Sequence, residues 1–186
     1  SLAFILIAGC ATTAKPQSLP LGQPSFGEYA VEARHWVEQN RAFQSEDRAI
    51  EAGWNSPQEW RPPGPITKGV LLVHGLGDSP WSFVDIEKYL SDRGYLVRTV
   101  LLPGHGTKPE DMIGVDIADW RRLVKEQAAL LRTEVEDIYL GGFSTGANLV
   151  LEYALDNDEA VSGLLLFSPA FKSSMAMDWA APLLAK

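Results

Sequence analysis

The stretch Asp137-Ile-Tyr-Leu-Gly-Gly-Phe-Ser-Thr-Gly-Ala-Asn-Leu-Val-Leu-Glu-Tyr-Ala-Leu155 decides the fold class of this chain. Residues 137–141 form a short apolar run typical of a strand buried in a parallel sheet. Residues 147–155 are apolar on several sides, as in a helix packed against a sheet. Between them, residues 142–146 have the Gly-x-Ser-x-Gly spacing of a nucleophile elbow, which requires this order of strand, turn and helix.

Ser144 is the residue that such a turn would expose. A nucleophile elbow holds its serine in a strained backbone conformation, with the hydroxyl above the sheet edge. Gly142 and Gly146 lack Cβ atoms and therefore let strand and helix approach closely. The helix N-terminus would direct free N–H groups toward Ser144. The alternative interpretation is a glycine-rich structural turn with a solvent-facing serine.

A second motif, His74-Gly75-Leu76-Gly77, ends the apolar run 69–74. A tight turn there would aim a backbone N–H at the serine, and the Thr145 N–H would be the second donor of an oxyanion hole. His74 is a tempting general base. At a strand end beside the turn, we expect it instead to form hydrogen bonds that brace the loop.

Alternating patterns surround these motifs. Four short apolar runs predict strands at 69–74, 95–101, 137–141 and 161–167, and helical spacing predicts helices at 81–93, 116–134 and 147–155. Residues 81–93 place Phe83, Ile86, Tyr89 and Leu90 on one helix face. One or two surface helices are expected over 29–51, and an irregular segment over 55–65. The alternation predicts an α/β fold with a doubly wound, mostly parallel sheet.

From Gly69 to Pro169 the chain resembles the α/β-hydrolases of the carboxylesterase and monoacylglycerol-lipase-like group. The resemblance rests on the two motifs and on the loop Leu102-Pro-Gly-His-Gly-Thr107. It implies that the Leu76 and Thr145 amides form the oxyanion hole and that His105 is structural. It also implies a serine hydrolase that cleaves carboxylic esters without a cofactor.

The chain departs from that family's pattern after Ser144. The family's acid and histidine follow the serine, but no histidine follows Ser144 here. Asp156, Asp158 and Asp178 do follow it, and we assign none of them as the acid. Either the domain is incomplete at its C-terminus or the chain is a short relative without a triad. We favour the first, because a sheet ending one strand beyond the serine would expose a long apolar edge.

The N-terminal segment predicts an anchor. Ile7-Ala8-Gly9-Cys10 follows an apolar run and resembles a bacterial lipobox, whose cysteine receives a lipid. We therefore expect a signal-peptide remnant at 1–9, lipidated Cys10 with a polar, Pro-rich tether over 10–27, and a lead-in over 28–65. A partial hydrolase domain covers 66–186, with a lid starting near 170–186. The expected location is the bacterial cell envelope, at the outer membrane or the periplasmic face.

Composition excludes several other classes. A net charge of -8 disfavours nucleic acid as a partner, and one cysteine excludes an internal disulfide. Three scattered histidines give no metal-ligand spacing, so no metal is expected. The expected partners are a small-molecule ester or lipid substrate and, through Cys10, a membrane. The alternatives are a thioesterase or peptidase of the same fold, and a non-catalytic lipoprotein that uses the fold for binding.

Overall fold

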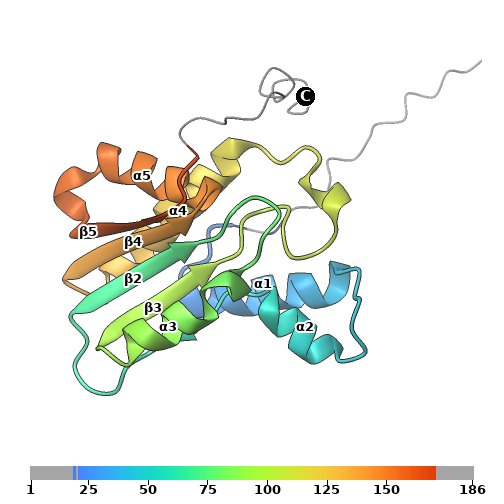
Figure 1. Ribbon diagram of the computed structural model, residues 1–186, viewed down its shortest axis with the longest axis horizontal. Coiled ribbons are helices and arrows are strands. Elements are labelled where there is room, and N and C mark those ends of the chain that lie inside the picture. The colour runs from blue at the N-terminus through green and yellow to red at the C-terminus, as the bar shows by residue number, and fades with distance from the viewer. Residues whose placement is uncertain (1–18, 20, 171–186) are drawn as a thin grey trace, which may run out of the picture.

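A twisted sheet with helices on both faces forms the centre of the molecule in the computed structural model, which describes Leu19 and residues 21–170 (Figure 1). The described strands are β1 (Glu59–Trp60), β2 (Lys68–Val73), β3 (Tyr95–Val100), β4 (Asp137–Phe143) and β5 (Gly163–Phe167). Their order in the sheet is β1-β3-β2-β4-β5. Neighbours are parallel except β1, which pairs antiparallel with β3.

The helices alternate with these strands. The described α-helices are α1 (Phe26–Asn40), α2 (Arg48–Trp54), α3 (Val84–Ser91), α4 (Ile117–Arg132) and α5 (Thr145–Asp156), with short 3-10 turns η1 (Pro80–Phe83), η2 (Pro109–Met112) and η3 (Asp158–Ala160). Figure 1 shows α3 on the near face of the sheet and α4 on the far face. The predicted α/β fold with a mostly parallel, doubly wound sheet is confirmed.

Side-chain alternation along β2 divides the core between the two faces. Leu71 and Val73 pack into the larger apolar cluster, to which α1, α4 and α5 contribute. Val70 and Leu72 point the other way and pack with Phe83, just before α3. All four strand residues are buried, as expected for a strand covered on both faces.

The N-terminal helix starts earlier than the sequence suggests. The Ser25 hydroxyl accepts a hydrogen bond from the Glu28 N–H (3.2 Å) and caps α1, which therefore begins at Phe26. The last two residues of the predicted tether, 10–27, thus belong to a helix. Leu19 and Phe26 are buried in the larger core cluster, so the end of that range is packed rather than solvated.

Two further expectations differ from the structure. The segment 55–65 contains β1, where Glu59 lies opposite Arg98 of β3 and its carboxylate is 2.7 Å from the guanidinium.

On α3, Tyr89 is exposed, although we placed it on the same helix face as Phe83, and Glu87 is buried instead. Tyr89 is stacked by the Arg93 guanidinium, 3.4 Å from the ring centre, which stabilises it at the surface.

Within the part of the chain that the structure describes, every helix is too short or too polar to cross a bilayer. Cys10 and the proposed signal remnant lie outside the described residues, as do Phe171 onward and most of the proposed lid.

Candidate active site

Ser144 occupies the bend between β4 and α5. Its backbone has φ 52° and ψ −114°, a conformation that side-chain-bearing residues rarely adopt. Its N–H donates to the Phe167 carbonyl at the end of β5 (2.9 Å), and its carbonyl accepts from the Asn148 N–H (3.2 Å). The bend is therefore held from the neighbouring strand and from the helix, and such strain costs about 1–3 kcal/mol.

The two glycines of the motif allow the bend because they leave room for backbone. A Cβ on Gly142 would lie 2.3 Å from the carbonyl carbon of Gly146, and a Cβ on Gly146 would lie 2.0 Å from the Val73 oxygen. Neither glycine has a positive φ, so close approach rather than backbone freedom requires them. The N-terminus of α5 is thus pressed against the ends of β2 and β4.

The turn after β2 lies directly against the elbow. A Cβ on Gly75 would be 3.0 Å from the Phe143 ring and 3.4 Å from the Cβ of Ser144. Asp78 N–H donates to the Gly75 carbonyl (3.3 Å) and closes the turn. In residues 21–170, no hydrogen-bond acceptor is found for the Leu76 N–H or the Thr145 N–H. Gly75, the residue before Leu76, therefore lies against Ser144, which is partly exposed, and Thr145 directly follows it, so both unpartnered amides belong to segments that meet at the serine.

His74 is buried, and both of its ring nitrogens are engaged. Nδ1 lies 2.8 Å from the Gly75 carbonyl, and Nε2 accepts a hydrogen bond from the Leu102 N–H (3.1 Å). The ring is therefore neutral, with its proton on Nδ1. It joins the turn after β2 to the loop after β3, which is the bracing contact we expected of it.

His105 makes the reciprocal contact from the other loop. Its Nδ1 lies 3.2 Å from the Pro103 carbonyl, and its Nε2 accepts from the Gly77 N–H (3.2 Å). The two imidazole rings meet edge to face with centroids 4.9 Å apart. We call His74 and His105 together the histidine clasp, because each accepts a backbone hydrogen bond from the loop that carries the other.

Burial keeps the histidine clasp uncharged. Loss of hydration, with a smaller contribution from the neighbouring His105, lowers the pKa of His74 to about 3. Burial also lowers the pKa of His105. Neither imidazole has a free acceptor nitrogen for the Ser144 proton, so neither is suited to be its base.

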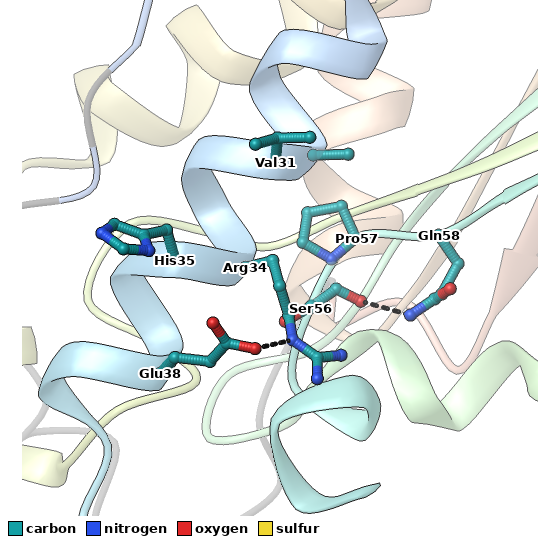
Figure 2. A pocket seen from close by; sticks show the side chains of 8 residues that line it. Val31, Arg34, His35, Glu38, Ser56, Pro57 and Gln58 are labelled. Carbon is teal, nitrogen blue, oxygen red and sulfur yellow. Dashed lines mark hydrogen bonds and ion pairs between the residues drawn. The ribbon is translucent and has the colours of Figure 1, made fainter. Parts of the chain in front are cut away.

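Several hollows lie on the described part of the molecule, some of them away from the elbow. One of about 420 Å³ runs from Gly77 and Asp78 along the loop 104–109 to Arg41, beside the proposed oxyanion turn. Figure 2 shows another of about 420 Å³, between α1 and residues 56–58, where Arg34 pairs with Glu38. The hollow in Figure 2 contains none of the predicted site residues. A further hollow lies at the end of α2.

The remaining predicted residues fall in several places. Asp156 ends α5 and Asp158 begins η3, at the end of the helix remote from Ser144. Asp178 lies outside the described residues.

Asn148 was not among the predicted site residues. Its amide exchanges two hydrogen bonds with Ala170, 3.0 and 3.1 Å long. That contact sets the direction of the chain after β5, and a polar residue in the first turn of an apolar helix was its only sequence signal.

The sheet order, the strained serine after β4 and the turn after β2 together define an α/β-hydrolase. A family model described as serine aminopeptidase, S33 (Hydrolase_4) matches residues 64–186, which is more than half of the chain. The chain belongs to this family.

Two bacterial proteins are similar in sequence to part of this chain. A thermostable monoacylglycerol lipase of Bacillus sp. (strain H-257) is 34% identical over 107 residues, which are 58% of this chain and 42% of that protein. A carboxylesterase of Bacillus subtilis (strain 168) is 32% identical over 80 residues, 42% of this chain and 32% of that protein. The chain therefore spans less than half the length of either relative.

Solved structures agree on the fold. One from work on LipS and LipT, two metagenome-derived lipolytic enzymes, has 26% identity and a TM-score of 0.63, covering 69% of this chain and 51% of that one. The monoacylglycerol lipase of Paleococcus ferrophilus has 23% identity and a TM-score of 0.57, covering 68% of this chain and 48% of that one.

Proposed function

We propose that this protein is a serine hydrolase of carboxylic esters in which Ser144 is the nucleophile. The observation that carries the proposal is the strained Ser144, held at the start of α5 beside the two unpartnered amides of Leu76 and Thr145. A helix N-terminus and two N–H groups stabilise the negative charge that develops when an acyl carbonyl is attacked.

The proposed reaction has two halves. The Ser144 hydroxyl attacks the acyl carbonyl carbon while a base takes its proton, and the oxyanion sits between the Leu76 and Thr145 amides. The same base returns the proton to the departing alcohol, which leaves an acyl-enzyme, and water then releases the acid. The base is proposed to be a group other than His74 and His105, since their nitrogens are occupied.

Apolar surface beside the serine favours an ester or lipid substrate. Leu76, in the turn after β2, is 57% exposed, and Phe143, the last residue of β4, is 41% exposed and directly precedes Ser144. These side chains would contact an acyl chain, in line with the lipase and carboxylesterase names of the two relatives. The family description names an aminopeptidase, so peptide bonds are the alternative substrate. Comparing a p-nitrophenyl butyrate with an alanyl p-nitroanilide distinguishes the two, and faster anilide cleavage would contradict the ester proposal.

A fluorophosphonate probe, applied to the full-length protein with its complete hydrolase domain, tests the nucleophile. We expect one covalent adduct per chain, on the peptide that contains Ser144, because the probe phosphonylates only an activated serine and expels fluoride. Mass spectrometry locates the adduct. Ser144→Ala should remove it, whereas Ser168→Ala should keep it. Ser168 is a matched control because it also follows a strand and has a positive φ of 47°. Equal labelling of the Ser144→Ala variant would mean that another serine is the activated one, and no labelling of the wild type would favour a non-catalytic binding module.

We further propose that Cys10 anchors the protein to the bacterial envelope through a lipid. The support is the Ile7-Ala-Gly-Cys10 sequence and the polar segment that follows it. Cells grown with radioactive palmitate should yield labelled protein in the membrane fraction. Cys10→Ser should lose the label and leave the membrane. A wild type without label, or a variant labelled equally, would refute the anchor.

A further inference from the structure

A third hollow, of about 290 Å³, lies where the end of α2, strand β1 and turn η1 meet. Its lining includes Ile50, Trp54, Trp60, Trp81, Val84 and Glu87, and none of the elbow residues. The Ser79 hydroxyl donates to the Trp54 carbonyl (3.1 Å), which fixes η1 against α2. The walls of the hollow therefore come from separate elements that are tied together, as in a formed binding site.

Three tryptophans line this hollow. Trp54, Trp60 and Trp81 are 40%, 37% and 49% exposed, although tryptophan is normally well buried. The rings of Trp54 and Trp81 are 5.1 Å apart and inclined by 45°, so their faces are not stacked flat on each other. Indole faces carry negative electrostatic potential and attract cations.

Glu87 adds a carboxyl group to the apolar lining. It is only 2% exposed, and its Oε1 has no hydrogen-bond partner. Burial raises the pKa of Glu87, while hydrogen bonds from the Thr99 and Trp60 side chains oppose that shift. In the described part of the chain, no lysine, arginine or histidine forms an ion pair with it. The position thus holds a buried acid without a compensating positive charge.

We propose that this hollow binds an organic ammonium group, with the tryptophan faces around the cation and Glu87 as its negative counter-charge. Aromatic faces combined with one acid are the chemistry that recognises alkylammonium ions. An ammonium ion in the hollow would bring a positive charge close to the Glu87 carboxyl group, which lines the hollow and has no ion pair in the described part of the chain. The net charge of -8 also favours positively charged over anionic ligands. Cation binding at this hollow does not require Ser144.

Titration with defined probes tests the proposal by calorimetry and by tryptophan fluorescence. The probes are choline, its uncharged isostere dimethylbutanol, and n-butylammonium. We expect both cations to bind at least tenfold more tightly than dimethylbutanol. The order of choline and n-butylammonium then shows whether ring contacts or N–H donation dominates. Dimethylbutanol binding as tightly as choline would overturn the proposal, because the hollow would then be merely apolar. So would the absence of binding by either cation.

Matched variants separate the acid and the rings from general charge effects. Glu87→Gln should lower choline affinity about tenfold, and Trp81→Ala should lower it by a similar factor. Asp85→Asn makes the same charge change on the exposed side of α3 and should leave affinity unchanged. Ser144→Ala should also bind choline normally, which makes this test independent of the proposed hydrolase activity. Equal affinities in the Glu87→Gln and Asp85→Asn variants would refute the role of Glu87. A shift to monomer in Trp81→Ala by light scattering would show instead that a second copy occupies the hollow.

Discussion

Replacing Gly146 by alanine is expected to destabilise the fold by about 4 kcal/mol or more, a large part of the stability of an ordinary domain. The added methyl group would lie 2.0 Å from the Val73 oxygen and 2.5 Å from the His74 oxygen. Both neighbours are backbone atoms at the end of a central strand, so neither can rotate away as a side chain would. The clash of the added methyl group can be relieved only if α5 moves away from the sheet. Urea unfolding followed by circular dichroism measures the loss.

Gly64→Ala is the matched control for this substitution. Gly64 has a positive φ of 89°, but a methyl group there would meet no atom within 4 Å. Its replacement should cost only about 1 kcal/mol, from backbone strain alone. Similar losses at the two positions would mean that crowding at Gly146 is relieved by small shifts, and the tight contact between α5 and β2 would then not be essential.

Lowering the pH from 7 to 3 is expected to remove about 4 kcal/mol of stability through His74. Its pKa is about 3 in the folded protein against 6.5 for an unperturbed imidazole, and each pKa unit is worth about 1.4 kcal/mol. Between these values the unfolded chain binds more protons than the folded one, so stability falls as the pH falls. The loss begins near pH 6.5 and is complete near pH 3.

The same prediction has a direct spectroscopic test. The nitrogen chemical shifts of His74 should report a neutral ring with its proton on Nδ1 at pH 5, where a free histidine is charged. In unfolding experiments, His74→Asn should lower stability at pH 7 but flatten its dependence on pH. His35→Asn removes an exposed imidazole on α1 and serves as the control. A His74 ring that becomes charged between pH 6 and 7 would contradict this picture.

The local parts of the site could be predicted because they depend on neighbours in the sequence. The Gly-x-Ser-x-Gly spacing and the flanking apolar runs together specify a strand, a sharp bend and a helix. The structure adds the strained φ of Ser144 and the distances that make Gly142 and Gly146 necessary. The mostly parallel sheet could be predicted from the alternation of strands and helices, whereas β1 is too short, at two residues, to show a pattern.

Long-range contacts were beyond sequence patterns. His74 and Leu102 are 28 positions apart, as are Gly77 and His105, and no periodicity links them. Glu87 was missed for a different reason. It lies at helical spacing of four from Phe83 and three from Leu90, but glutamate is rarely buried, so its residue type gives no reason to place it in the core.

The histidine clasp has a consequence for recombining this protein with its relatives. Each imidazole accepts a hydrogen bond from a backbone N–H of the other loop, so the shape of each loop depends partly on the sequence of the other. A chimera that imports only residues 74–78, or only 101–107, would separate a histidine from the amide it was matched to. The two loops therefore depend on each other for their shape. Exchange of substrate preference by loop grafting should succeed only when both loops are transferred together.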